Sequence, residues 1–178
     1  DAIVLCPPSA DFQADTVCEG VATSFTNLSI PASVYRWYFG DGDSSIQVTN
    51  TNVSHIYNSC GFYTATLIAG DGNNCQDTFT QTVFVRCLPI VAFQAPSVCV
   101  GNVVNFIDQS SSSNGVITTW SWDFGDTNTS SNQNPTNVYA SDSSYFVSLT
   151  VTDTEGCSNT GIDSVQIFPI PTVDVIDT

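Results

Sequence analysis

The sequence predicts an all-β protein made of two immunoglobulin-like β-sandwiches joined end to end. The first observation behind this is an internal repeat. Phe12-Gln-Ala and Val17-Cys18 recur as Phe93-Gln-Ala and Val98-Cys99, about 80 residues later. The second is a period-two alternation of apolar and polar residues in segments such as 63–67 and 79–85, which is typical of strands with one buried face. No helical period is sustained, and each repeat holds about seven short strands.

The repeat sets the expected domain limits. Its matches keep one order: Trp37-x-Phe-Gly-Asp41 with Trp122-x-Phe-Gly-Asp126, Tyr57 with Tyr139, and Asp71…Cys75 with Asp153…Cys157. Residues 7–87 therefore form a first domain and residues 88–169 a second. Residues 1–6 match the end of a repeat and residues 170–178 the start of one, so we expect both termini to be cut from a longer array.

Composition narrows the function. The chain has 178 residues, 17 acidic and two basic side chains, and a net charge of −15. Nucleic acid is excluded as a partner because two arginines cannot neutralise a run of phosphates. No apolar run approaches the roughly 20 residues that span a bilayer, so membrane insertion is not expected. One histidine and no lysine leave little for catalysis, and we expect neither an enzyme nor a bound cofactor.

Seven cysteines are the most informative residues. They form no Cys-x-x-Cys pair and only one histidine accompanies them, which favours disulfides over a zinc site. Disulfides indicate an oxidising compartment, and the expected location is extracellular or at the cell surface.

Cys60 and Cys87 are expected to pair with each other. Their equivalents in the second repeat are Asp142 and Pro169, so both cysteines are absent there together. If strand 62–69 turns back into strand 78–86, the two cysteines lie opposite each other at one end of the hairpin, within disulfide range.

Cys18 and Cys75 have counterparts in Cys99 and Cys157, and their pairing stays open. Pairing within each domain would join Cys18 to Cys75 and Cys99 to Cys157. However, the first and sixth turns of such a sandwich lie at opposite ends, whereas head-to-tail stacking brings the first turn of one domain to the sixth turn of the next. That geometry favours an inter-domain bridge from Cys18 to Cys157, with Cys75 and Cys99 left for neighbouring repeats. A third scheme joins Cys6 to Cys75 and Cys87 to Cys157.

The two repeats resemble the PKD (polycystic kidney disease) domain. The segments that carry the resemblance in the first repeat are Trp37-Tyr-Phe-Gly-Asp-Gly42, His55-Ile-Tyr57 and Gly61-Phe-Tyr-Thr-Ala-Thr-Leu67. In the second they are Trp122-Asp-Phe-Gly-Asp-Thr127, Asn137-Val-Tyr139 and Tyr145-Phe-Val-Ser-Leu149. The resemblance implies that Trp37 and Trp122 fill the cores and that Tyr57 and Tyr139 form buried corners. Acidic, lysine-free, cysteine-bearing tandem units of this kind look like parts of large surface proteins of gliding or adhesive Bacteroidota.

We therefore expect a non-catalytic spacer in a repetitive surface adhesin or filament, with neighbouring repeats of the same chain as partners. One alternative is a module that binds surface polysaccharide or another protein through exposed aromatics such as Tyr35, Tyr38 or Trp120. Another is an accessory domain of a secreted hydrolase. Some PKD-like domains bind Ca²⁺, and carboxylates on loops suit that ion, so Asp41, Asp43, Asp123 and Asp126 are the candidate ligands.

Overall fold

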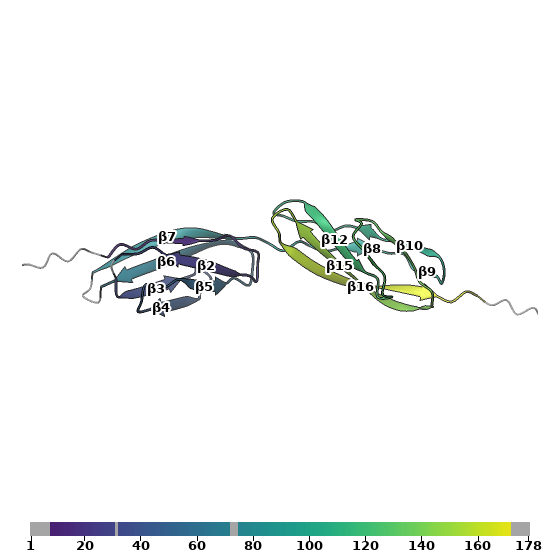
Figure 1. Cartoon of the computed structure of the whole chain (residues 1–178), viewed down its shortest axis with the longest axis horizontal. Coiled ribbons are helices and arrows are strands. Elements are labelled where there is room, and N and C mark those ends of the chain that lie inside the picture. The colour runs from purple at the N-terminus through teal and green to yellow at the C-terminus, as the bar shows by residue number, and fades with distance from the viewer. Residues whose placement is uncertain (1–7, 31, 72–74, 172–178) are drawn as a thin grey trace, which may run out of the picture. The chain divides into compact units, whose positions relative to one another are not determined.

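The computed structural model describes residues 8–30, 32–71 and 75–171, all of whose regular elements are strands (Figure 1). Residues 1–6 and most of 170–178, the predicted fragments of further repeats, lie outside the described residues, as does Cys6. The chain divides into two compact units between Cys87 and Leu88. Among the described residues there is no helix long and apolar enough to cross a membrane.

The first unit contains two antiparallel sheets. One sheet has the order β1-β2-β5 and the other β4-β3-β6-β7, which is the order of an immunoglobulin-like sandwich. Apolar side chains alternate with polar ones along the strands, so that each sheet turns one face to the core; β2 shows this as three exposed residues alternating with three buried ones. The strands are β1 (Phe12–Ala14), β2 (Ala22–Asn27), β3 (Val34–Tyr38), β4 (Ser44–Gln47), β5 (Val53–Ile56), β6 (Gly61–Gly70) and β7 (Gln76–Val85).

The second unit repeats this plan with shorter, interrupted strands. Its main sheet has the order β13-β12-β15-β16-β9, and β9 joins β16 in parallel. Two small ladders, β10-β14 and β11-β8, make up the opposite layer. The strands are β8 (Phe93–Gln94), β9 (Val98–Cys99), β10 (Val103–Asn105), β11 (Ile107–Asp108), β12 (Ile117–Asp123), β13 (Thr129–Ser130), β14 (Thr136–Val138), β15 (Ser143–Asp153) and β16 (Ser158–Phe168).

Each unit has its own aromatic core. The four aromatic residues predicted for the cores, Trp37, Trp122, Tyr57 and Tyr139, are at most 1% exposed. The Trp37 ring meets Phe12 edge-on with centroids 5.1 Å apart, and Trp122 meets Phe93 in the same way at 5.1 Å. Such edge-to-face contacts add to the burial of large apolar surfaces at the centre of each sandwich.

The turn after the core tryptophan needs glycine. Gly40 has φ +90° and Gly125 has φ +76°, and both pack tightly on the neighbouring strand. A Cβ on Gly40 would lie 2.6 Å from the Thr64 carbonyl oxygen, and one on Gly125 would lie 2.5 Å from that of Phe146. A side chain is therefore excluded by contact as well as by backbone conformation.

A buried tyrosine ties this turn to the core in each unit. The Tyr57 hydroxyl donates to the Phe39 carbonyl at 2.9 Å, and the Tyr139 hydroxyl donates to that of Phe124 at 3.1 Å. Burial raises the pKa of Tyr139 to about 12 and raises that of Tyr57 further, so both phenols stay protonated as donors.

Candidate functional site: cysteines at the two poles of each unit

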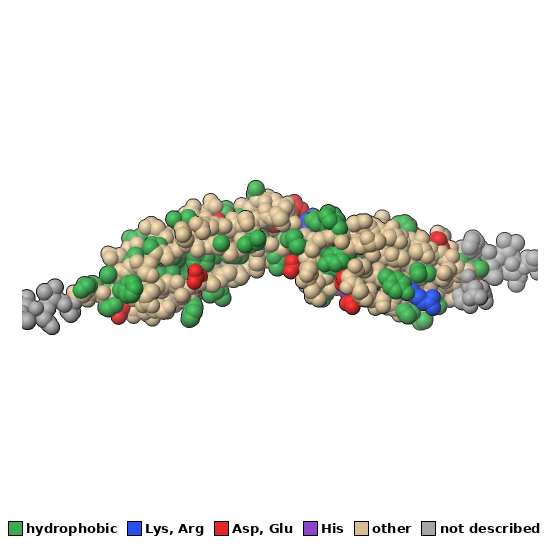
Figure 2. Space-filling view, turned by 180° about the vertical axis from the view of Figure 1, so that it is seen from behind, with side chains coloured by type: hydrophobic (Ala, Val, Ile, Leu, Met, Phe, Trp, Pro, Cys, Tyr) green, Lys and Arg blue, Asp and Glu red, His purple; other side chains and the backbone are tan. Residues whose placement is uncertain are grey.

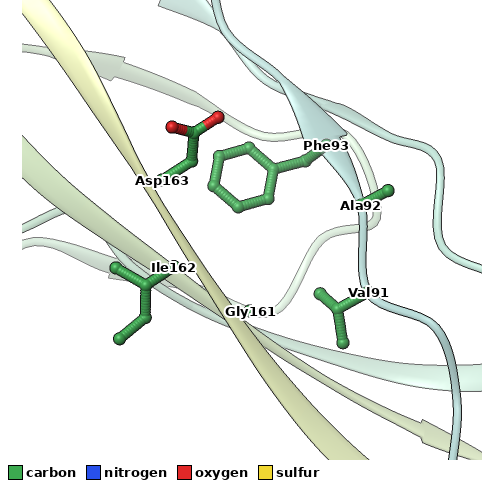
Figure 3. A pocket seen from close by; sticks show the side chains of 6 residues that line it. All are labelled: Val91, Ala92, Phe93, Gly161, Ile162 and Asp163. Atoms are coloured by element: carbon green, nitrogen blue, oxygen red, sulfur yellow. The ribbon is translucent and has the colours of Figure 1, made fainter.

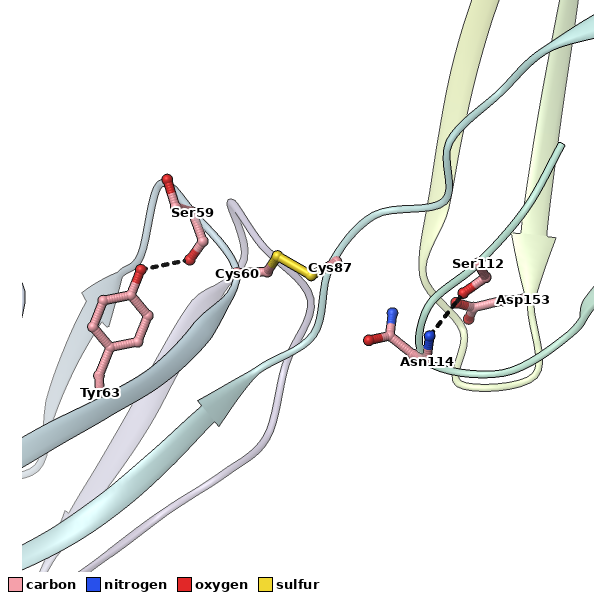
Figure 4. The surroundings of a disulfide bond; sticks show 7 residues. All are labelled: Ser59, Cys60, Tyr63, Cys87, Ser112, Asn114 and Asp153. Atoms are coloured by element: carbon pink, nitrogen blue, oxygen red, sulfur yellow. Dashed lines mark hydrogen bonds between the residues drawn. A yellow bond between two sulfur atoms is a disulfide. The ribbon is translucent and has the colours of Figure 1, made fainter.

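A disulfide joins Cys60 to Cys87 at the end of the β6–β7 hairpin, with 4.6 Å between their Cα atoms (Figure 4). The last ladder pair before it is Gly61 with Val85, so the ladder is displaced by one residue from the expected register, which placed Cys60 opposite Cys87. The displacement leaves the Cα separation within the normal range for a disulfide. Beside the bond, the Tyr63 hydroxyl donates to the Ser59 carbonyl at 2.7 Å.

Cys18 and Cys99 lie at what we call the C-terminal pole of their units, the end at which the chain leaves the sandwich. Cys18 forms a parallel bridge with Arg86, the residue before Cys87, and Cys99 pairs in parallel with Phe168 at the end of β16. The local backbone is the same in both. The residue three positions after each cysteine donates its N–H to the cysteine carbonyl at 3.1 Å. The glycine two positions after the cysteine, Gly20 or Gly101, donates its N–H to the carbonyl of the corner tyrosine.

Cys75 and Cys157 lie at the N-terminal pole, the end at which the chain enters each sandwich. In both, an aspartate four residues earlier accepts a hydrogen bond from the cysteine backbone. The Cys75 N–H donates to Asp71 Oδ1 at 3.2 Å, and the Cys157 N–H donates to Asp153 Oδ1 at 3.0 Å. Two residues beyond each cysteine, a side chain contacts the incoming chain: Asp77 accepts from Ala10 N, and Asn159 donates to the Pro89 carbonyl.

The bonding states of these four cysteines differ. Cys18 and Cys157 are disulfide-bonded, whereas Cys75 and Cys99 are free. The expected alternative of pairing within domains, Cys18 with Cys75 and Cys99 with Cys157, is therefore wrong. The physical reason is the length of the last strand, because β7 separates Cys75 from the Cys18 pole by ten residues, or about 33 Å at ~3.3 Å per residue. β16 separates Cys157 from Cys99 in the same way.

The third scheme joined Cys87 to Cys157 and Cys6 to Cys75. Its first pairing is wrong, because Cys87 is bonded to Cys60. Its other half involves Cys6, which lies outside the described residues. The bridge from Cys18 to Cys157 stays a prediction.

The candidate Ca²⁺ ligands of the first unit lie together. Asp41, Asp43 and His55 place one ligand atom each within 4.8 Å of one another. The contact within the group is between His55 Nε2 and Asp41 Oδ2 at 2.6 Å, and the imidazole stacks on Phe39 at 4.2 Å. Partial burial raises the pKa of Asp41, but the hydrogen bonds from His55 and Asp43 outweigh it and hold that pKa below its usual value.

The second unit fills the same position with amides. Asp126 Oδ2 accepts hydrogen bonds from Asn128 Nδ2 at 3.0 Å and Asn137 Nδ2 at 2.8 Å. Asp123 Oδ1 accepts from Gly125 N at 2.9 Å. In both units the carboxylate therefore ties the turn after the core tryptophan to the β5 or β14 strand, with His55 replaced by Asn137. Ca²⁺ binding by these aspartates stays a prediction.

The aromatic residues expected at the surface fall into three environments. Tyr35 is 2% exposed and belongs to the core, so its expected surface role is wrong; it lies two residues from Trp37 and therefore on the same inward face. Tyr38 is exposed on the outer face of the β4-β3-β6-β7 sheet, where Phe62 and Phe84 stack with centroids 4.7 Å apart.

Trp120 lines a hollow of about 390 Å³ in the second unit, together with Asp108, Ser110 and Gln133. Asp108 Oδ2 accepts from Trp120 Nε1 at 2.7 Å and from Gln133 Nε2 at 3.2 Å. Burial raises the pKa of Asp108, but hydrogen bonds from Ser110, Trp120 and Gln133 bring it below its usual value. Sequence reasoning missed this carboxylate, although it precedes Ser110 by two residues in a typical Asx turn.

A second hollow in this unit, of about 250 Å³, lies between residues 91–93 and β16 (Figure 3). Val91 packs closely on β16 here because Gly161 has no side chain; a Cβ there would lie 2.9 Å from Val91 Cγ1. Asp163 is the one titratable residue in its lining, so this hollow brings together no pair of groups for acid–base chemistry.

Charged side chains are sparse on the surface. Figure 2 shows one face, on which acidic groups are scattered among uncharged and apolar ones. Of the two arginines, Arg86 donates from Nη1 to the Thr16 carbonyl at 3.2 Å. The surface thus carries excess negative charge without a basic patch among the described residues.

The strand order, the buried tryptophan and the tyrosine corner define each unit as an immunoglobulin-like β-sandwich module. The PKD domain model matches residues 6–87 and again residues 88–167. The chain therefore belongs to the PKD domain family, with two copies in tandem.

Known relatives match parts of the chain. A microbial collagenase of Vibrio alginolyticus is 44% identical over 69 residues, which is 38% of this chain and 8% of the collagenase. The pre-pro-metalloprotease PrtV of Vibrio cholerae is 43% identical over 58 residues, 33% of this chain and 6% of the protease. The crystal structure of the PKD1 domain of Vibrio anguillarum Epp is 30% identical with a TM-score of 0.44, covering 48% of this chain and 99% of that domain. The matched stretches thus make up less than a tenth of the two proteases.

Proposed function

We propose that the chain is a non-catalytic spacer of a repetitive, disulfide-stabilised adhesin or filament at the cell surface, of the kind that serves adhesion and gliding motility. The observation that carries the proposal is the distribution of bonded and free cysteines over the two poles. A binding or catalytic module needs one site, whereas a spacer needs a means of joining one unit to the next. We take the cysteines at both poles of both units as that means.

The proposed joint is a disulfide between Cys18 and Cys157. Cys18 lies at the pole where the first unit ends and Cys157 at the pole where the second begins, and Leu88 follows Cys87 directly along the chain. Pairing Cys18 with Cys75 is excluded by the length of β7 and by the free Cys75 thiol. A covalent bridge beside a short linker would limit the bending that adjacent domains otherwise show.

Small-angle X-ray scattering on two matched variants tests this joint. In C18S/C157S we expect a broader distribution of interatomic distances than in the unmodified chain, because the units then reorient about the linker. The matched control, C60S/C87S, removes a bond within the first unit and leaves the distribution narrow. Identical profiles for the unmodified chain and C18S/C157S would contradict the spacer proposal.

A second candidate function is that of an accessory domain beside a protease. The 43–44% identity to stretches of a collagenase and a metalloprotease favours it. In that role the chain would bind the protein substrate or a surface polysaccharide, through the outer-face residues Tyr38, Phe62 and Phe84 or through the Trp120 hollow. Aromatic surfaces with nearby polar groups suit both ligands.

Cosedimentation with insoluble fibrillar collagen and with insoluble polysaccharide separates the two candidates. Retention on either material that is lost in F62A or W120A supports the accessory role. Equal recovery of the unmodified chain and both variants in the supernatant contradicts it and leaves the spacer.

A further inference from the structure

The two free thiols occupy positions at which the other unit has a bonded cysteine. Cys99 is the counterpart of the bonded Cys18, and Cys75 is the counterpart of the bonded Cys157. Each unit therefore has one bonded and one free pole. The first unit is free at its N-terminal pole, and the second is free at its C-terminal pole.

At each free cysteine, one backbone hydrogen bond repeats the bond made at its disulfide-bonded counterpart. At the N-terminal pole, Asp71 N donates to the Cys75 carbonyl at 3.1 Å, as Asp153 N does to that of Cys157 at 3.0 Å. At the C-terminal pole, Asn102 N donates to the Cys99 carbonyl at 3.1 Å, as Val21 N does to that of Cys18 at 3.1 Å. The described backbone next to each free thiol thus already makes the hydrogen bond that its bonded counterpart makes, and such pre-ordering lowers the entropic cost of association.

Both thiols are within reach of a partner. Cys75 is exposed and Cys99 is half-buried. A bond between thiols of two chains needs only one pole of each chain.

We propose that Cys99 of one chain forms a disulfide with Cys75 of a second copy, so that the oxidised chain assembles head to tail. This inference rests on the proposed joint, since it repeats between chains the pairing of a C-terminal pole with an N-terminal pole that Cys18 and Cys157 would make within one. Because the contact is heterologous, each added copy presents a new free pole and the assembly stays open.

The bond forms by thiol–disulfide exchange with a small-molecule disulfide such as oxidised glutathione. The Cys75 thiolate attacks one glutathione sulfur, which forms a mixed disulfide and releases one glutathione thiolate. The Cys99 thiolate of the second copy then attacks the Cys75 sulfur and releases the other glutathione. One glutathione disulfide is reduced to two thiols, and two protein thiols lose their protons and become one disulfide.

The test uses the whole chain with Cys6→Ser in all variants, because Cys6 lies outside the described residues. After incubation with oxidised glutathione, we expect a ladder of multimers on non-reducing gels that collapses to monomer with reductant. C75S and C99S alone are each expected to stay monomeric, and a mixture of the two to form dimer through Cys99 of the first and Cys75 of the second. Mass spectrometry should find the peptide that links Cys75 to Cys99.

Two results would overturn the proposal. One is a monomeric parent chain under these conditions. The other is dimer formation by C75S or C99S alone as extensive as in the mixture, which would mean unselective thiol pairing. If peptide mapping still links Cys18 to Cys157 in either case, the proposed joint survives and only the intermolecular inference fails.

Discussion

Removing the disulfide between Cys60 and Cys87 should destabilise the first unit and leave the second unchanged. The bond closes a loop of sequence separation 27. In the chain-entropy model, a loop of that length costs the unfolded chain about 12 cal/mol/K, or about 3.5 kcal/mol at 25 °C. The equilibrium constant for unfolding of the first unit should therefore be about 300-fold larger in C60S/C87S, since each 1.4 kcal/mol is a factor of ten.

Hydrogen exchange read out by mass spectrometry measures both units in one sample. Amides of β6 and β7 that exchange through global opening should exchange about 300-fold faster in the variant, whereas those of β15 and β16 should not change. The second unit is the internal control, because Asp142 and Pro169 stand where the first has its disulfide.

The reverse experiment sharpens the test. Ser143 with Ile167 is the last ladder pair of the second unit, just as Gly61 with Val85 is that of the first. Positions 142 and 169 are therefore geometrically equivalent to 60 and 87, and D142C/P169C should slow exchange in β15 and β16 by a similar factor. A change of less than tenfold in C60S/C87S, or equal changes in both units, would refute the reasoning.

Three further perturbations follow from the contacts of single residues. Gly40→Ala should lower the free energy of unfolding by more than about 2 kcal/mol, because its Cβ would collide with the Thr64 carbonyl. Gly42→Ala is the matched control, with open space around its Cβ and Thr127 tolerated at the equivalent position; equal losses in a denaturant titration would contradict this account. Tyr57→Phe should cost about 1–3 kcal/mol by leaving the buried Phe39 carbonyl without its donor, measured in the same titration, and a neutral effect would argue against the corner hydrogen bond. Burial raises the pKa of Asp153, but hydrogen bonds from Ser112, Cys157 and Glu155 bring it below its usual value. Because the pKa of Asp153 is lower in the folded than in the unfolded chain, where it is about 4, ionisation of this carboxyl stabilises the folded state above pH ~4. This contribution is lost as the pH falls through the pKa of the folded state. Asp153→Asn should therefore lower the free energy of unfolding of the second unit at pH 7 and reduce the further loss of that free energy in acid. The control is Asp142→Asn, at an exposed site. An acid-induced loss in Asp153→Asn as large as in this control would count against the assignment.

Much of the fold was accessible from the sequence because few interactions decide it. The Trp-x-Phe-Gly-Asp segment places two aromatic residues inward and one glycine in a turn that tolerates no side chain, in both units. Period-two alternation indicates which face each residue occupies, but it does not say which sheet a short strand joins. The parallel pairing of β9 with β16 therefore had no local signal.

Two errors at the candidate sites were avoidable from the same alternation. Residues that lie directly opposite each other on paired strands face the same side of the sheet. The inward-facing Tyr63 and Leu67 of β6 must therefore lie opposite the inward-facing Val83 and Phe79 of β7. The expected register, which is offset by one residue, would have placed them opposite outward-facing residues. Tyr35 shares the inward face of Trp37 and so could not serve at the surface. The cysteine pairing was harder to predict. Which cysteines share a pole depends on the strand lengths and on the order of the turns, and neither follows from the local sequence around a cysteine.

The most direct test of the account is disulfide mapping of the native chain after digestion without reductant. Before any incubation with oxidised glutathione, we expect one peptide pair that joins Cys60 to Cys87 and another that joins Cys18 to Cys157, with Cys75 and Cys99 recovered as alkylated thiols. A peptide pair that joins Cys18 to Cys75, or Cys99 to Cys157, would contradict the assignment of these cysteines to the poles and with it the proposed spacer.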